Sequence, residues 1–448
     1  MIVVIISAVL TVTAQNPSTK QDSTKSSNTE KVKKGFSMGG VPALAYDADL
    51  GFLYGIILNF YNYGDGSSYP NYKQSLYLEW SRTTKGSGKN IMELDVRDIF
   101  PHTRMKAEVS YLTEQALNFY GFNGYNAYYG NQFVNQESDD YISRLYYRHD
   151  RRMWRIGANF EGRLSGNKWR WLAGANYYGI KIAPVDLAKL NEGKSENDML
   201  PDTAGLYDKY VEWGVIPQDQ KNGGNNTMLN FGAVYDSRDV EASPGKGMWS
   251  EAIFIAAPGF LGNKYSFTKL VLTHRQYISL IKKKLVFAYR LSAQMKLSGE
   301  IPFYLLPFYV RSNSVKDGLG GSKTLRGILR NRVVGDGIFQ SNVELRYTFL
   351  RFVWLNQNWS LTLSAFSDMG QVIIPYKFDK SGVEAGYGFT KEENLNMLDY
   401  GNEKLHISYG GGLHIALNTN FIVAVDYGFA HSPQDGKSGL YIALNYIF

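Results

Sequence analysis

The sequence has no cysteine, and it has no apolar run of about 18 residues, the length that a membrane-spanning helix requires. Without cysteine the chain can form neither a disulfide scaffold nor a thiolate metal site. The mean hydropathy of −0.29 gives no bulk membrane signal. A transmembrane β-barrel is compatible with both absences, because its strands alternate between lipid-facing apolar residues and polar residues.

Catalytic patterns are also missing. The six histidines are scattered, and none belongs to an H-E-x-x-H metal motif. His406 and His414 lie near one predicted strand, where we interpret them as strand-face or interface residues. No G-x-S-x-G element of a hydrolase occurs. The sequence therefore predicts no enzyme, no cofactor and no metal site, with an outer-membrane hydrolase as a remote alternative.

Positive charge is not concentrated in any one segment. The net charge is +7, but lysine and arginine are interleaved with acidic residues and form no basic helix. We therefore expect no nucleic-acid partner. The chain is instead rich in aromatic residues and glycine, with 33 Tyr, 24 Phe and 45 Gly. Transmembrane barrels use both, because aromatic girdles mark the two membrane interfaces and tight turns favour glycine.

The N-terminus predicts an export signal. Residues 2–12 are apolar but too short to span a bilayer, and Ala14 offers a small-residue cleavage site. We predict a signal peptide over residues 1–14, a disordered periplasmic leader over 15–35 and a barrel over 36–448. A buried strand is the alternative for the apolar run. No basic residue precedes the run, which leaves the true start and the cleavage site open.

From about residue 50 the apolar residues recur with a period of two rather than 3.6. Within 285–297 every odd-numbered residue is apolar or aromatic, whereas Arg290, Gln294 and Lys296 fall on the other face. We predict an all-β antiparallel transmembrane barrel of about sixteen strands, an even number, with about fourteen as the alternative. The predicted strands are 50–62, 72–83, 89–98, 103–113, 141–149, 152–163, 168–182, 226–238, 246–257, 264–279, 283–297, 338–351, 358–368, 404–415, 418–430 and 438–448.

Connection lengths alternate, and the long connections lie at about 114–140, 183–225, 298–337 and 369–403. Barrels keep short turns in the periplasm and long loops outside, so both termini are expected in the periplasm. Closure would pair the first predicted strand, 50–62, with the last, 438–448. On that last strand, which ends on the C-terminal barrel signal Tyr446 and Phe448, we expect Leu440, Ile442, Leu444, Tyr446 and Phe448 to face lipid, and Tyr441 and Asn445 to face the lumen.

Three separated motifs lie among these strands: Y-D-S-R-D at 235–239, G-G-S-K-T-L-R-G at 320–327 and F-S-D-M-G at 366–370. The alternation places Asp368 in the lumen, together with the charged pair Asp236 and Arg238. The loop 298–337 is basic and glycine-rich. We expect it to fold back into the lumen, where an arginine can find bidentate carboxylate partners.

Together these motifs resemble those of the BamA/TamA (bacterial surface antigen) outer-membrane superfamily, and the likeness covers most of 226–448. It implies a sixteen-stranded barrel whose loop between the eleventh and twelfth strands carries an arginine tip that contacts an aspartate on the thirteenth strand. Ile328 departs from the aromatic residue that the family usually has there. By resemblance, the loop tip is Leu325, Arg326 and Gly327, and the lumen partner motif is Phe366, Asp368 and Gly370.

The resemblance implies an outer-membrane protein of a Gram-negative bacterium that acts in protein assembly or translocation. Too few residues separate Ala14 from the first predicted strand for a POTRA module, so we expect a member that lacks these periplasmic domains and works with partners. Expected partners are outer-membrane lipid, both lipopolysaccharide and phospholipid, and other outer-membrane or periplasmic proteins. The alternative is an outer-membrane channel or a plugged structural barrel. Weak pairing between 50–62 and 438–448, hinted at by Gly51 and Gly55, would favour assembly.

Overall fold

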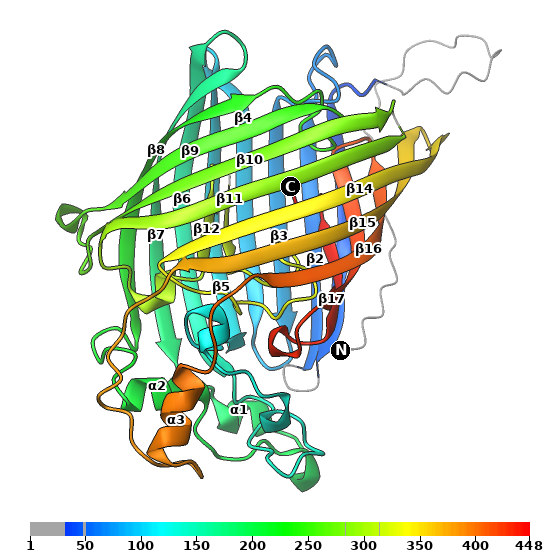
Figure 1. Cartoon of the computed structure of the whole chain (residues 1–448). Coiled ribbons are helices and arrows are strands. Elements are labelled where there is room, and N and C mark those ends of the chain that lie inside the picture. Colours follow the sequence, from blue (N-terminus) through cyan, green and yellow to red (C-terminus); the bar gives the residue numbers. More distant parts are fainter. Residues whose placement is uncertain (1–31, 48–50, 283, 313) are drawn as a thin grey trace.

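A computed structural model describes residues 32–47, 51–282, 284–312 and 314–448. In it sixteen antiparallel strands form one sheet in chain order, and the sheet curls into a barrel (Figure 1). The predicted fold class and number of strands are therefore confirmed. The predicted signal peptide and most of the predicted leader fall on residues 1–31, outside the described residues.

The sheet uses every long strand, each paired with its neighbours in the sequence. Its members are β1 (Phe36–Asp47), β2 (Gly51–Asn62), β3 (Gln74–Thr83), β4 (Gly88–Phe100), β5 (Thr103–Asn118), β6 (Arg148–Ser165), β7 (Trp169–Ala183), β8 (Gly223–Asp236), β9 (Gly247–Ala257), β10 (Phe267–Ile281), β11 (Leu285–Gly299), β14 (Gly337–Trp354), β15 (Gln357–Ile374), β16 (His406–Leu417), β17 (Phe421–Ala430) and β18 (Ser438–Leu444).

The remaining elements are short and lie in the connections. A small hairpin of β12 (Phe308–Arg311) and β13 (Ser314–Asp317) stands apart from the main sheet. The helices are α1 (Leu187–Asn191), α2 (Leu206–Glu212) and α3 (Lys391–Leu398), with 3-10 turns at Gly124–Asn126, Asn131–Phe133, Glu196–Asp198, Gly259–Leu261, Phe303–Leu305 and Pro433–Asp435. Within the described ranges, no helix is long and apolar enough to cross a membrane.

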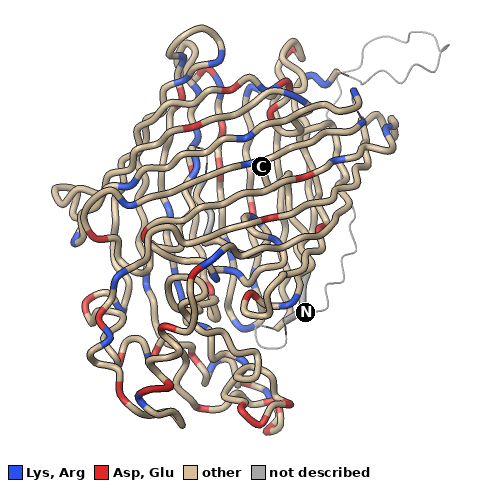
Figure 2. The backbone as a smooth tube through the Cα atoms, in the orientation of Figure 1, with Lys and Arg blue, Asp and Glu red and all other residues tan. Residues whose placement is uncertain are grey.

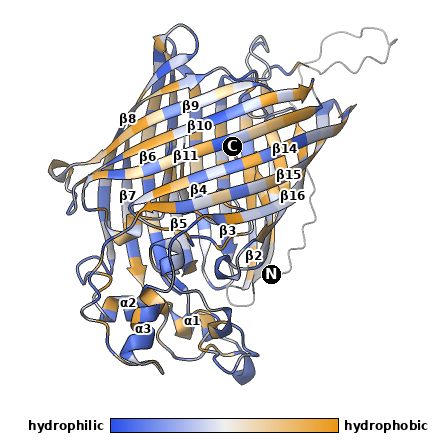
Figure 3. Cartoon of the chain, in the orientation of Figure 1, coloured by the Kyte–Doolittle hydropathy of each residue, from blue (hydrophilic) through white to orange (hydrophobic). Residues whose placement is uncertain are grey.

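Each strand turns one face to the lumen and the other to the exterior. Phe231 and Leu363 expose 50% of their surface outward and Leu291 exposes 43%, whereas Arg290 and Asp368 are fully buried inside. Figure 3 shows the resulting alternation of hydrophobic and hydrophilic residues along the strands. Charged residues recur along the strands as well as in the loops (Figure 2). An apolar exterior with a polar interior is the arrangement that lipid selects.

The predicted number of strands was right although one predicted strand is wrong and one observed strand was not predicted. Residues 119–147 form a loop, so the predicted strand 141–149 is wrong except where β6 begins at Arg148. The strand that replaces it in the count is β1, for which no strand was predicted. Gly39, Gly40 and Pro42 interrupt its alternation, and such residues weaken a strand pattern. The structure accommodates Pro42 because β1 lies at the edge of the sheet and pairs with β2 alone.

The long connections gather at one end of the barrel, the end that carries α1, α2 and α3 (Figure 1). By the rule of short periplasmic turns this is the outer end. Aromatic side chains from three loops pack there into what we call the outer cap. Phe119 meets Tyr210 edge-on at 5.3 Å between ring centroids, and Phe122 lies 4.7 Å from Tyr376. Other buried members are Tyr120, Tyr129, Phe133, Tyr146, Tyr147, Tyr207 and Trp213.

The two edge strands of the sheet are β1 and β18, and we call the interval between them the seam. Among the described residues no ladder of backbone pairs joins β1 to β18. Side chains bridge the gap at the inner end: the Tyr61 hydroxyl donates to the Asn420 carbonyl oxygen at 3.1 Å, and the Asn420 amide donates to the Tyr63 hydroxyl at 3.0 Å. The predicted pairing of 50–62 with the last strand is therefore wrong, because that segment is β2, one strand inside the edge.

The last four residues leave the sheet and enter the lumen. Strand β18 ends at Leu444, and Asn445 adopts a left-handed backbone with φ of +63°, a conformation that asparagine tolerates better than most residues. Phe448 is 7% exposed and packs against Tyr277 and Ala288 of the lumen wall. The Arg346 guanidinium lies 4.0 Å from the Tyr446 ring and 5.0 Å from the Phe448 ring.

This turn corrects the expected orientation of the terminal residues. Tyr446 and Phe448 were predicted to face lipid and Asn445 to face the lumen. In the structure the two aromatic residues turn inward toward arginine side chains, whereas Asn445 lines the lumen cavity as predicted. Upstream of the turn the predicted alternation is confirmed. Leu440 and Ile442 are 41% and 39% exposed, and the hydroxyl of Tyr441 accepts a lumen-side hydrogen bond from Gly327 N–H at 3.0 Å.

Candidate functional site

The loop between β11 and β14, residues 300–336, folds into the barrel, and we call it the plug loop. It connects the eleventh and twelfth strands of the sheet. Its Leu319, Leu325 and Ile328 are at most 1% exposed and form an apolar cluster with wall residues that include Val372. The loop therefore behaves as part of the interior rather than as a surface connection.

Gly327 allows the tip of the plug loop to touch the barrel wall. Its φ is +92°, and a β-carbon there would lie 2.8 Å from backbone atoms of Gly428 and Phe429 in β17. Gly428 shows the reciprocal restriction, because its own β-carbon would lie 2.8 Å from the backbone carbon of Arg326. Two glycines facing each other thus bring two backbones into direct contact, which side chains would prevent.

Arg326 is the centre of the contact between plug and wall. Its Nε and Nη2 donate to the two Asp368 oxygens at 2.9 and 3.0 Å, and its backbone N–H donates to the same carboxylate at 3.0 Å. Its Nη1 lies 2.6 Å from Glu344 and 3.3 Å from Asp426. The guanidinium carbon also lies 3.5 Å from the centroid of the Phe366 ring. Three carboxylates from three strands therefore surround one fully buried guanidinium.

Further side chains balance these carboxylates. Asn342 donates to Asp368 at 2.7 Å, Arg346 pairs with Glu344 at 2.6 Å, and the His414 ring nitrogen lies 2.9 Å from Asp426. Buried charges are tolerated only when they are paired and hydrogen-bonded. The arrangement suits a rigid connection between the plug loop and the barrel wall.

The structure divides the motifs predicted from sequence between two places. Leu325, Arg326 and Gly327 lie together with Phe366 and Asp368, and Gly370 lies beside them, where a β-carbon would be 2.6 Å from the Leu325 side chain. The charged pair lies elsewhere: Arg238 donates to Asp236 at 3.0 Å, just beyond the end of β8, and stacks over Trp249 at 4.3 Å.

The partners Glu344 and Asp426 were not predicted. The alternation places both on lumen faces, but which lumen residues reach Arg326 depends on how the curved sheet brings β14, β15 and β17 around the plug loop.

A second buried cluster fastens the outer loops, and we call it the rim cluster. His406 places Nδ1 2.5 Å from Asp435 and Nε2 3.3 Å from Glu403. The Tyr125 hydroxyl donates to Asp435 at 2.5 Å, and its ring stacks on the imidazole at 3.9 Å. Arg332 of the plug loop donates to backbone carbonyls on both sides, including Gly124 at 2.8 Å. His406 thus connects residues of different loops, whereas the sequence pattern predicted only a strand-face or interface residue.

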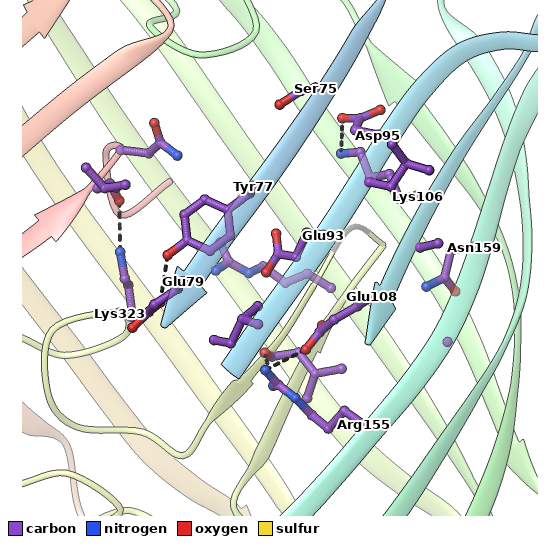
Figure 4. Close-up of a pocket in the computed structure, with 18 of the residues that line it drawn as sticks. Ser75, Tyr77, Glu79, Glu93, Asp95, Lys106, Glu108, Arg155, Asn159 and Lys323 are labelled. Carbon is purple, nitrogen blue, oxygen red and sulfur yellow. Dashed lines mark hydrogen bonds and ion pairs between the residues drawn. The ribbon is translucent and has the colours of Figure 1, made fainter. Parts of the chain in front are cut away.

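Between the plug loop and the wall lies a lumen cavity of about 590 Å³. Acidic residues of β3, β4 and β5 line one side of it, including Glu79, Glu93 and Glu108 (Figure 4). Basic side chains pair with some of the acidic residues of the cavity: Arg155 pairs with Glu108 at 2.7 Å, and Lys106 lies 3.8 Å from Asp95. Among the described residues, no group of three His, Cys, Asp or Glu side chains is placed to hold a metal ion.

Comparisons with known proteins agree with this architecture. The Omp85 superfamily domain matches residues 104–448. CdiB from Escherichia coli is similar in structure, with a TM-score of 0.51 and 10% sequence identity over 92% of this chain and 62% of that chain. BamA from Haemophilus ducreyi lacking POTRA domains 1–3 is similar with a TM-score of 0.48 and 16% identity, over 92% and 69% of the two chains. A search of curated proteins finds no match.

Proposed function

Because this chain belongs to the Omp85 superfamily, we propose that it resides in the outer membrane of a Gram-negative bacterium and assists the assembly or translocation of other outer-membrane components. The observation that carries this proposal is the seam, which no backbone ladder closes in the described part of the chain. The N–H and C=O groups of an open strand edge template pairing with another strand, and lipid offers them no alternative partner. An incoming strand satisfies that requirement.

The plug loop supports this function over that of a wide pore. Arg326 and its three carboxylates fix the loop across the lumen, so a client chain engages the barrel from the side. The seam is bridged by side chains such as Tyr61 and Asn420 rather than by a continuous ladder. Such contacts separate without unzipping a sheet, which suits an edge that opens and closes.

A channel is the second candidate. The cavity of about 590 Å³ is lined by charged groups of both signs, and a polar, hydrated lumen is what small ions require. In this alternative the seam stays shut and the plug loop narrows the passage. A plugged structural barrel, which conducts nothing, is the limiting case.

The proposal also names partners. Outer-membrane lipid, both phospholipid and lipopolysaccharide, covers the apolar exterior, on which Phe231 and Leu363 lie half exposed. Other outer-membrane or periplasmic proteins deliver clients to the seam or receive them from it. The periplasmic side is the expected docking side, because the short turns there leave the edges of β1 and β18 accessible.

Depletion of the chain in its host tests the proposal. We expect the levels of a subset of outer-membrane proteins to fall while their synthesis continues, and protein isolated from native membranes to bring those clients or periplasmic partners with it. Purified protein in planar bilayers should show no steady conductance. Unchanged levels of other outer-membrane proteins, together with steady conductance, would replace the proposal with the channel.

A further inference from the structure

Two arginines of the lumen wall and one of the plug loop come together beside the C-terminal residues. Arg275 of β10 and Arg290 of β11 are direct cross-strand partners. Arg311 of β12 shares two contacts with Arg290. Both donate to the Ile447 carbonyl oxygen, at 3.4 and 3.2 Å, and both lie over the Tyr309 ring, 5.9 and 5.8 Å from its centroid. We call Arg275, Arg290 and Arg311 the arginine triad.

The triad carries more positive charge than its surroundings balance. Its one ion pair within the described chain joins Arg275 to Glu251 at 3.9 Å. Arg326, by contrast, has three carboxylates within 3.3 Å. Like charges repel strongly where water is scarce, so a triad with one close carboxylate is less fully balanced than Arg326.

The triad also has N–H groups without an acceptor. Among the described residues, buried Nε and Nη2 of Arg275, Nη2 of Arg290 and Nε of Arg311 make no hydrogen bond. The Arg275 side chain is nearly enclosed, since the residue is only 4% exposed, and Arg290 is fully buried. Buried donors are almost always satisfied in folded proteins, which indicates that something other than the protein accepts these bonds.

Two arginines of the triad border the lumen cavity. Arg275 and Arg311 line the cavity of about 590 Å³ together with Ile447 and Phe448, and Arg290 donates to the carbonyl oxygen of Ile447 at its edge. The acidic residues of β3, β4 and β5 line another part of the same cavity. A solute in the cavity therefore meets a cationic surface on the side of β10 and β12.

We propose that the arginine triad binds a phosphate-class oxyanion in the lumen cavity, either inorganic phosphate or the phosphate group of a lipid headgroup. A guanidinium presents planar pairs of N–H donors that match phosphate oxygens. The donors of Arg275 and Arg311 come from different elements, so they suit a tetrahedral anion whose oxygens point in several directions. An anion also adds negative charge beside a triad whose one close carboxylate in the described chain is Glu251. This binding goes beyond the proposed function and does not depend on it.

Calorimetric titration of the full chain in detergent, in phosphate-free buffer, tests the site. The probes are inorganic phosphate, glycerol 3-phosphate and lipid A in mixed micelles. We expect wild type to bind, and the double variant R275Q/R311Q to bind at least about tenfold more weakly, because charge-assisted hydrogen bonds from two arginines are lost. The single variant R311Q serves if the double variant does not fold. The matched control is K89Q, which removes a positive charge from the same cavity at a residue paired with Glu79.

The pattern across probes and variants decides the outcome. Binding of inorganic phosphate that K89Q keeps and the triad variants lose supports the site, and the same pattern with lipid A alone supports it with a headgroup as the source. Equal binding by wild type and the triad variants overturns it. Failure of wild type to bind any of the three probes also overturns it, and water then satisfies these donors.

Discussion

At the scale of single residues, Arg326 determines whether the plug loop stays in the lumen. Taking a guanidinium out of water is costly unless its partners replace the lost hydration, and here Asp368 accepts two hydrogen bonds from the guanidinium and a third from the Arg326 backbone N–H. The lock therefore depends on the complete set of partners. Removing the cation would leave Asp368, Glu344 and Asp426 crowded together inside the barrel.

Arg326→Ala should destabilise the folded barrel by roughly 3–5 kcal/mol, the cost of leaving a buried charge without its partner. The measurement is the temperature to which a sample must be heated before the folded form of the barrel disappears from a gel, with an unheated sample as reference. Lys323→Ala is the control, because Lys323 lies three residues away in the plug loop and donates to the Leu444 carbonyl oxygen rather than into this lock. Equal losses of barrel stability in the two variants would show that the ion pairs of Arg326 contribute no more than the contacts of Lys323.

Gly327→Ala should dislodge the loop tip, because the new β-carbon would meet the β17 backbone at 2.8 Å. Gly321→Ala is the matched control: its φ of +82° is similarly left-handed, but a β-carbon there meets only the Arg330 side chain, at 3.4 Å. We expect trypsin to cut the plug loop of the Gly327 variant much faster than that of the Gly321 variant. Similar rates would mean that backbone strain, not close packing, is the constraint.

Lys209 in α2 makes the outer cap sensitive to pH. The residue is 1% exposed, and its ammonium lies 4.7 to 5.0 Å from the centroids of Tyr146, Tyr387 and Phe389. Burial lowers its pKa from 10.5 to about 8, and Glu212 offsets part of that effect. Between these two values the unfolded segment binds more protons than the folded one, so the stability of the cap rises with pH.

Hydrogen exchange in α2 should therefore slow between pH 8 and 10, after correction for the intrinsic dependence of exchange on pH. Lys209→Met keeps the apolar stem and removes the titration, so its corrected exchange rate should stay flat across this range. If wild type and the methionine variant respond alike, Lys209 does not control the cap.

At the scale of elements, the period of two was sufficient to predict most of the sheet. It predicted the long strands β11, β14 and β15 with the correct inward and outward faces, because one side of each meets lipid and the other a polar lumen. It failed for β1, where Gly39, Gly40 and Pro42 interrupt the pattern. It also failed for 141–149, where Tyr146 and Tyr147 pack into the outer cap instead of a strand.

The inward turn at Asn445 was not predictable from alternation, since the apolar pattern continues unbroken to Phe448. The left-handed backbone of Asn445 turns the chain inward there. This turn brings Phe448 into contact with Arg346 and with Arg290 of the arginine triad. The lock of the plug loop was predictable in part. Sequence patterns identify Arg326 and Asp368 as partners. That Glu344 and Asp426 also reach Arg326 depends on the curvature of the whole sheet, which the sequence patterns do not give.

The rim cluster should hold the outer loops together as one element. His406→Ala would leave the buried Asp435 and the partly buried Glu403 without their shared partner, so we expect faster proteolysis within 119–147 and 431–437. His431→Ala is the control, because His431 is exposed and its backbone N–H is what bonds to the sheet. If proteolysis of the His406 variant is unchanged, the outer cap alone holds these loops together.

At the scale of the whole molecule, the barrel combines a locked interior with an open edge. The plug loop, the rim cluster and the outer cap fix the lumen and the outer end, whereas side-chain hydrogen bonds such as those of Tyr61 and Asn420 bridge the seam at its inner end. In the described part of the chain, the facing edges of β1 and β18 lack a backbone ladder. Since a strand edge in lipid must be paired, the proposed function makes the seam the place where the molecule exchanges its own contacts for those of a client.

A disulfide across the seam tests this claim most directly, and the chain brings no cysteine of its own. Gly39 lies in β1 and Phe421 at the start of β17, the neighbour of β18, and the Phe421 ring carbon Cγ lies 2.9 Å from the position of a Gly39 β-carbon. The β-carbons of the pair Gly39→Cys and Phe421→Cys are therefore within about 4.4 Å, the range that a disulfide needs. Thr348→Cys with Thr362→Cys is the control, since it links β14 and β15, which are already paired.

In host cells that carry these variants in place of the native chain, the decisive measurement is the outer-membrane level of client proteins under oxidising and reducing conditions. If clients pair at the seam, the oxidised seam variant lowers client levels, a reductant restores them, and the control pair behaves as wild type in both conditions. Wild-type client levels with a fully oxidised seam would show that clients do not need the seam to open.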